Sequence, residues 1–108
     1  MWIALPAPVA AFFAAERKQD LLALAGCFGD HAVVSDEGRT IRGSPDIKRW
    51  MREAKAQHQH TVEPIEAASR DGKTVLVARV AGKLANSPLD FEQVFTIEGG
   101  KMSSLEIR

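Results

Sequence analysis

Asp36 is the side chain best placed to do chemistry. It begins a polar, glycine-punctuated segment at residues 36–43, DEGRTIRG, which lies between two apolar stretches and leads into a helix. A carboxylate at the mouth of an apolar pocket can serve as a general base, and such a base contributes about 10² to 10⁴ in rate. An aspartate in a turn can equally bond to the backbone near Gly38, as an Asx turn. The segment therefore predicts either a proton-abstracting carboxylate or a structural turn.

Gln93 is the second candidate, because it is a polar residue on a strand face that is otherwise apolar, between Phe91 and Phe95. An amide buried there must find a partner, since leaving it unsatisfied costs on the order of 1 to 3 kcal/mol. The partner would be a ligand, a water, a core hydroxyl or a group on a helix. A pocket contact and a structural hydrogen bond both remain open for this residue.

Aromatic and aliphatic side chains are expected to shape the cavity around these two groups. Trp50 can line the pocket or pack in the core, and its indole N–H needs a partner in either case. Trp2 is expected to pack as a lid or at an interface. The predicted ligand-binding residues are Phe12, Trp50, Phe91, Phe95 and Leu105.

Other reactive residue types give weaker patterns. His58 and His60 would face one side of a strand, but no acidic or cysteine partner stands at ligand spacing nearby, so we expect no metal site. The chain has no glycine-rich phosphate loop, serine elbow or cysteine–histidine pattern. Arg39 and Arg42 are expected to be solvated or paired with acidic neighbours. We expect chemistry without a cofactor.

Three helices are expected to precede the sheet. The first has Pro8 in its first turn and runs to residue 18, and Asp20 caps the second, which would end at residues 29–30. Ser44 would cap the third, with Pro45 at its first position. This third helix is expected to bury one stripe and to expose four cations; the buried residues are Ile47, Trp50, Met51 and Ala54, and the exposed ones are Lys48, Arg49, Arg52 and Lys55.

Strand patterns fill the rest of the chain. A short strand at residues 32–34 would pair with residues 40–42 as a hairpin. From His60 onward the pattern alternates, and turn signals at 71–72, 86–88 and 99–100 divide it into four strands.

The register of these strands follows from keeping one face apolar. Pairing Leu84 with Leu89 would place Gly82 opposite Phe91 and Lys83 opposite Asp90. At the last turn a two-residue loop would put Glu106 beside Gln93. A three-residue loop is favoured instead, because it brings Leu105 and Ile107 there.

Composition limits the class of protein. A chain of 108 residues fits one domain, residues 1–108, and its 14 basic and 14 acidic residues lack the basic excess that nucleic-acid binding requires. The single cysteine, Cys27, is expected to be a buried thiol in a reducing compartment. No run is long enough to cross a membrane, and the apolar N-terminus lacks the positive start of a signal peptide. We expect a soluble, cytoplasmic protein that does not bind membranes.

Several segments together resemble the superfamily of SnoaL-like polyketide cyclases and ketosteroid isomerases, which has the nuclear-transport-factor-2-like fold. The segments are 14–15, 20–22, 28–36, 42–43 and 95–101, and the resemblance covers essentially the whole chain. It implies an α+β, cystatin-like roll, in which a cone-shaped, curved antiparallel sheet packs against three N-terminal helices. It also implies a homodimer formed through the convex face of the sheet.

The resemblance also implies roles for particular residues. Asp36 matches the general base of the isomerases, whereas the tyrosine and protonated aspartic acid of their oxyanion hole match Phe12 and Gln93. Phe12 cannot donate a hydrogen bond, and Gln93 can.

The sequence thus predicts a domain that binds a small apolar organic molecule. It would be a cofactor-independent isomerase, cyclase or dehydratase, with Asp36 acting on an apolar carbonyl compound. The alternative is a non-catalytic homodimeric binding or interaction module. A cavity of at least about 300 Å³ would favour ligand binding, whereas an outward-facing Asp36 would contradict an enzyme.

Overall fold

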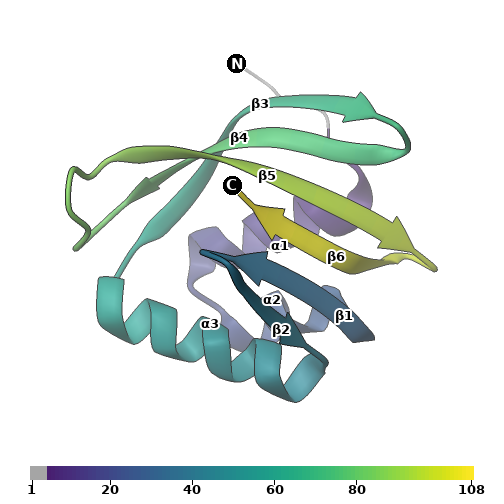
Figure 1. Cartoon of the computed structure of the whole chain (residues 1–108), viewed down its shortest axis with the longest axis horizontal. Helices are drawn as coiled ribbons and strands as arrows, with labels where there is room; N and C mark the ends of the chain where they lie inside the picture. The colour runs from purple at the N-terminus through teal and green to yellow at the C-terminus, as the bar shows by residue number, and fades with distance from the viewer. Residues whose placement is uncertain (1–4) are drawn as a thin grey trace.

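The computed structural model describes residues 5–108, so Trp2 lies outside the described part of the chain. Three helices come first, with one hairpin between the second and third, and a four-strand meander follows (Figure 1). The elements are α1 (Ala7–Lys18), α2 (Leu21–Gly26), β1 (Phe28–Asp36), β2 (Arg39–Arg42), α3 (Ser44–His58), β3 (Thr61–Arg70), β4 (Lys73–Ala81), β5 (Leu89–Glu98) and β6 (Lys101–Ile107). The predicted α+β architecture, a curved sheet packed against three helices, is confirmed.

The six strands form one curved sheet in the order β2-β1-β6-β5-β4-β3, and the helices pack against its inner face (Figure 1). β2 and β3 are the two edges, so the described strands do not close into a barrel. β1 and β6 run parallel, which makes the sheet mixed rather than fully antiparallel. No hairpin joins these two strands, so no turn forces them to be antiparallel.

The predicted register between β4 and β5 is wrong by four residues. Leu76 pairs with Gln93, and Val80 pairs with Leu89, while the chain from Gly82 onward leaves the sheet before β5 begins. An even shift keeps every side chain on its predicted face, so the apolar face survives the error. Gly82 therefore does not lie opposite Phe91.

The same shift changes the ion pair on the outer face. Asp90 lies opposite Arg79 rather than Lys83, and Arg79 Nε donates to Asp90 Oδ1 at 3.0 Å. The prediction of an outer face carrying paired charges holds with a different partner.

The last hairpin, between β5 and β6, places the predicted apolar residues beside Gln93, but its turn differs from the prediction. Its turn has two residues, because Glu98 pairs with Lys101, so the predicted three-residue loop is wrong. A bulge near Thr96 adds the extra residue instead, and Gln93 then pairs with Ile107. The apolar face next to Gln93 is kept, as predicted.

The helix ends show one confirmed cap and two corrections. Asp20 caps α2, since its Oδ1 accepts from Ala23 N at 3.1 Å. However, α2 ends at Gly26 rather than at residues 29–30, and β1 begins at Phe28. Gly43, with φ of 85°, occupies the N-cap of α3, so Ser44 is already helical and does not cap it. A positive φ suits glycine and lets the chain turn sharply from β2 into α3.

An aromatic cluster joins α1 to the inner face of the sheet. Phe12 makes edge-to-face contacts with Phe13, Phe28 and Phe95, at centroid distances of 5.3, 5.9 and 5.7 Å. Such contacts add to the stability gained from burying the rings. In the described part of the chain no helix is both long enough and apolar enough to span a bilayer.

Candidate functional site

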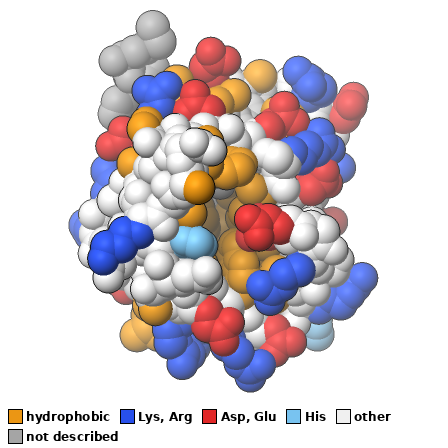
Figure 2. All heavy atoms as spheres, turned by 60° about the vertical axis from the view of Figure 1, so that its left-hand side comes forward, with side chains coloured by type: hydrophobic (Ala, Val, Ile, Leu, Met, Phe, Trp, Pro, Cys, Tyr) orange, Lys and Arg blue, Asp and Glu red, His pale blue; other side chains and the backbone are white. Residues whose placement is uncertain are grey.

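A cavity of about 230 Å³ opens between α3 and the inner face of the sheet. Figure 2 shows it as a hollow with hydrophobic walls and charged side chains around its rim. Its volume is below the roughly 300 Å³ set above as the size that favours ligand binding, so that expectation is not met and only a small molecule would fit. The lining residues used below are Phe12, Glu16, Asp36, Glu37, Arg39, Trp50, Lys55, Gln57, His58, His60, Phe91, Gln93 and Leu105.

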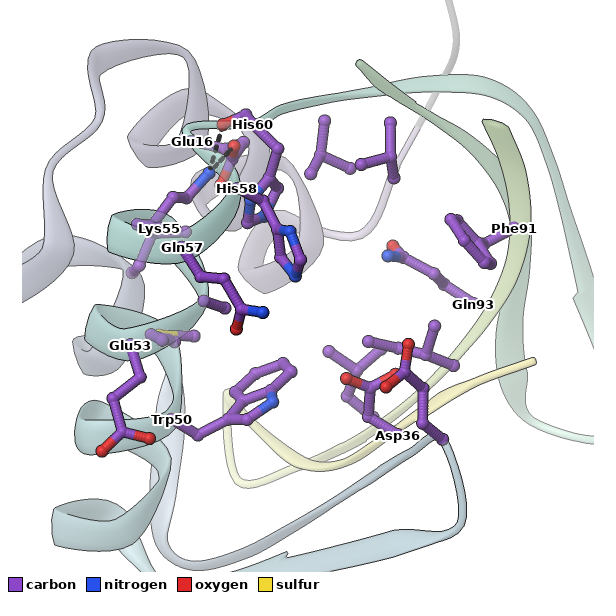
Figure 3. Close-up of a pocket in the computed structure, with 18 of the residues that line it drawn as sticks. Glu16, Asp36, Trp50, Glu53, Lys55, Gln57, His58, His60, Phe91 and Gln93 are labelled. Atoms are coloured by element: carbon purple, nitrogen blue, oxygen red, sulfur yellow. Dashed lines mark hydrogen bonds and ion pairs between the residues drawn. The ribbon is translucent and has the colours of Figure 1, made fainter. Parts of the chain in front are cut away.

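Asp36 is the last residue of β1 and lines this cavity, where its carboxylate faces the Trp50 side chain (Figure 3). Burial, followed by the nearby Glu37 carboxylate, raises the pKa of Asp36. The Trp50 indole N–H and the positive charge of Arg39 act in the opposite direction. A raised pKa brings a carboxylate closer to the working range of a general base.

Gln93 lies in the middle of β5 with only 4% of its surface exposed, and its amide points into the cavity (Figure 3). Its Oε1 has no hydrogen-bond partner among residues 5–108. A buried amide oxygen without a partner is rare, because desolvating it costs free energy that nothing returns. The structure therefore gives no structural bond for this buried oxygen, on a side chain whose amide end points into the cavity.

Replacing Gln93 by leucine should raise the free energy of unfolding by about 1 kcal/mol, because an apolar side chain of similar size removes the cost of burying an unpaired amide. Urea denaturation of the wild type and the Gln93→Leu variant measures the difference. A loss of stability would show that the amide has a structural partner instead.

Four of the five predicted ligand-binding side chains line the cavity, namely Phe12, Trp50, Phe91 and Leu105. Phe95 does not. It is fully buried and packs edge-to-face against Phe12 and Phe13, so it supports the wall from behind. The bulge in the hairpin of β5 and β6 places Phe95 opposite Leu105.

A polar wall that the sequence did not predict lies opposite Asp36, formed by the end of α3 and the link to β3. Gln57, His58 and His60 lie there (Figure 3), and the prediction that His58 belongs to a strand is wrong, since α3 runs to His58. Helical spacing from Trp50 to residues 54 and 57–58 was the available signal. In residues 5–108 no group of three or more metal-ligating side chains is gathered.

His60 is held neutral by its surroundings. Burial, and then the positive charges of Lys55 and His58, lower its pKa to about 4 from an ordinary 6.5. Its Nδ1 is buried without a hydrogen-bond partner among the described residues.

The folded protein binds a proton at His60 less readily than the unfolded chain does. The free energy of unfolding is therefore highest above pH 6.5 and falls as the pH decreases toward 4. We expect this loss to be on the order of 1 to 2 kcal/mol, since His60 is only about half buried and solvent screens its charge. Urea denaturation across this range should show the loss in the wild type and in a His31→Gln control. A His60→Gln variant that kept the full loss would contradict the assignment.

A buried ion pair closes the inner end of the cavity. Lys55 of α3 bonds to Glu16 of α1, and the two side chains are only 13% and 4% exposed. Lys55 Nζ also donates to the main-chain oxygen of His60 at 3.0 Å (Figure 3). The prediction that Lys55 is solvated is wrong, because the helix turns this cation toward Glu16.

Comparison with known proteins agrees with this architecture. The family model of the SnoaL-like domain matches residues 9–105. A crystal structure of a candidate polyketide cyclase from Sinorhizobium meliloti is 36% identical, with a TM-score of 0.92 over 96% of this chain and 95% of that one.

More distant structures share the fold. A protein of ketosteroid isomerase-like fold from Catenulispora acidiphila, in complex with trimethylamine, is 20% identical, with a TM-score of 0.82 over 97% of this chain and 86% of that one. A cystatin-fold protein from Novosphingobium aromaticivorans is 20% identical, with a TM-score of 0.80 over 99% of both chains. No curated protein matches the sequence.

Proposed function

The chain belongs to the family of SnoaL-like domains. On that basis we propose that its cavity binds a small, largely apolar carbonyl compound. We propose further that Asp36 removes a proton from the carbon next to the carbonyl. The observation that carries the proposal is the pair of groups across the cavity. A half-buried carboxylate with a raised pKa lies on one side, and a buried amide without a partner for its oxygen lies on another.

The proposed step is an enolisation without a cofactor. The C–H bond breaks, its proton moves to the Asp36 carboxylate, and the electron pair forms the C=C bond while charge develops on the carbonyl oxygen. Gln93 can donate an amide N–H to that oxygen, whereas Phe12 offers only an apolar edge. The Trp50 N–H faces the carboxylate and helps to orient it.

The 36% identical structure from Sinorhizobium meliloti, a candidate polyketide cyclase, supports the proposal of an enzyme. Isomerisation, cyclisation and dehydration all begin with this proton removal, and the family fold accommodates each of them.

Exchange of the α-hydrogens of tetralone, a two-ring ketone, tests the proposal. In D₂O the wild-type protein should accelerate deuterium uptake at these carbons, as followed by proton NMR. Accelerated exchange would support proton abstraction in the cavity. No acceleration at concentrations that saturate the protein would refute catalysis of this step.

A non-catalytic binding module is the second candidate, and the cavity's modest volume favours it. This candidate predicts that tetralone shifts the NMR signals of the Gln93 amide and Trp50 indole without any exchange of its hydrogens.

We further propose that the outer face of the sheet forms a homodimer. Val75 and Val94 pair there, Val75 partly exposed and Val94 buried, and the Arg79–Asp90 and Arg108–Glu92 ion pairs flank them. An apolar centre with a polar rim is typical of such interfaces. Sedimentation at micromolar concentration should give a dimer, and a monomer would refute this assembly.

A further inference from the structure

His58 is the best-positioned of the polar groups on the wall opposite Asp36. It is the last residue of α3, and its ring projects into the cavity, toward the region between Trp50 and Gln93 (Figure 3). The ring of His60 lies behind it, with 6.1 Å between the two centroids. His58 is therefore the histidine that reaches toward the centre of the site.

The main chain of Lys83 holds His58 in two ways. Lys83 N donates to His58 O at 2.7 Å, and His58 Nδ1 lies 3.4 Å from Lys83 O. A carbonyl oxygen only accepts, so this contact places the hydrogen of a neutral imidazole on Nδ1. Nε2 is then the nitrogen that remains for the cavity, where it can take up a proton and donate it.

Gly82 allows the Lys83 segment to come this close. A Cβ at residue 82 would lie 2.7 Å from the Cα of His60 and 2.8 Å from His58 O. Both contacts are shorter than side chains tolerate, so only glycine fits without a shift of the backbone. The loop after β4 is thereby packed directly against the segment that carries His58.

Charged and titratable groups from every neighbouring element share this space with His58. Asp36 and Glu37 come from the end of β1 and its turn, Arg39 from β2, Glu53 and Lys55 from α3, and His60 from the link between α3 and β3. The Glu53 carboxylate points away from the cavity (Figure 3). Lys55 is paired with Glu16, and burial keeps His60 neutral. Asp36 and His58 therefore stand as the facing carboxylate and imidazole of the cavity.

We propose that His58 is a second catalytic residue, which protonates a departing oxygen of the substrate while Asp36 removes the proton from carbon. This inference rests on the proposed function and narrows it to an elimination from a small, neutral, ring-containing compound that carries a hydroxyl β to a carbonyl. The C–H proton passes to Asp36, the electron pair forms the C=C bond, the C–O bond breaks, and the oxygen leaves as water with the proton of His58. Solvent then restores both groups.

The ring opening of nitrobenzisoxazole tests both groups with one probe. A base removes its ring C–H proton, the N–O bond breaks to give a nitrile, and the phenolate oxygen that forms takes a proton or a hydrogen bond from a donor. The product absorbs visible light, so the initial rate is read directly. The wild-type protein should open this ring far faster than free acetate does.

His58→Gln should lower kcat on the order of 10²-fold, with KM little changed, because the donor acts on charge that exists only in the transition state. The matched control is His31→Gln, an exposed residue of β1, which should keep the wild-type rate. Asp36→Asn should abolish most of the acceleration.

The outcomes separate the two claims. If His58→Gln keeps the wild-type rate while Asp36→Asn loses it, the role of His58 is overturned and the proposed function stands. If the wild type gives no acceleration, the proposed function fails and this inference fails with it. A variant that fails to fold is replaced by nitrogen NMR of the His58 ring in the wild type, titrated with para-nitrophenol. A shift of the Nε2 signal supports the contact, and an unchanged signal overturns it.

Discussion

Lys55→Met is expected to lower the free energy of unfolding by about 3 to 5 kcal/mol, because it leaves the Glu16 carboxylate buried without its partner. The two side chains are almost fully buried, and Lys55 also donates to the His60 main-chain oxygen, so the substitution removes two bonds of one ammonium group. Solvent cannot replace these bonds at the closed end of the cavity. Urea denaturation at neutral pH measures the loss.

A double variant separates two causes of the stability loss, the unpaired Glu16 carboxylate and the lost packing of the Lys55 side chain. Glu16→Leu combined with Lys55→Met should recover most of the loss, since a buried ion pair replaced by apolar side chains is often neutral or even stabilising. Lys48→Met, on the exposed side of the same helix, should stay within about 0.5 kcal/mol of the wild type. A loss of less than about 1 kcal/mol for Lys55→Met would indicate a solvated surface pair.

Asp36→Asn is expected to reduce the exchange of tetralone α-hydrogens by about 10² to 10⁴-fold, because an amide cannot accept the proton. Asparagine keeps nearly the same shape, so the cavity and the Trp50 contact site are retained. Binding of tetralone should therefore remain while exchange is lost. Asp30→Asn, an exposed position of β1, is the matched control and should exchange at the wild-type rate.

The same substitution should stabilise the fold at neutral pH. Burial raises the pKa of Asp36, so the folded protein holds that proton more tightly than the unfolded chain does. Ionising this carboxyl, which begins near pH 3.9 in an unfolded chain, then costs folding free energy as the pH rises through the raised pKa. The stability gain of Asp36→Asn should accordingly grow from acid to neutral pH. An Asp36→Asn variant that loses stability at neutral pH would contradict a raised pKa.

The fold was predictable because local patterns agree with it. Alternation alone assigns the residues of β4 and β5 to their correct faces, even though the register was off by four. Register depends on where a strand stops, and the chain from Gly82 to Pro88 leaves the sheet for a reason that no local pattern carries. Gly82 must pass close to the main chain of His58 and His60, which lies far away in the sequence.

Of the candidate site, only Asp36 and Gln93 could be predicted from the sequence. Asp36 follows a strand, and Gln93 interrupts an apolar face, so each stands out from its neighbours in the sequence. Lys55 is predicted as an exposed residue of a helix, because a charged residue there is normally solvated, and His58 is predicted on a strand. Their burial depends on Glu16 and on the main chain of Lys83, which reach them from other elements.

A crystal structure of the protein with naphthol, a two-ring mimic of an enolised ketone, tests the central claim most directly. We predict that its rings lie between Trp50 and Phe91 and that its oxygen lies within hydrogen-bond distance of the Gln93 amide, with Asp36 facing the ring. Naphthol bound elsewhere, with the cavity closed around its own side chains, would contradict a ligand site at Asp36 and Gln93.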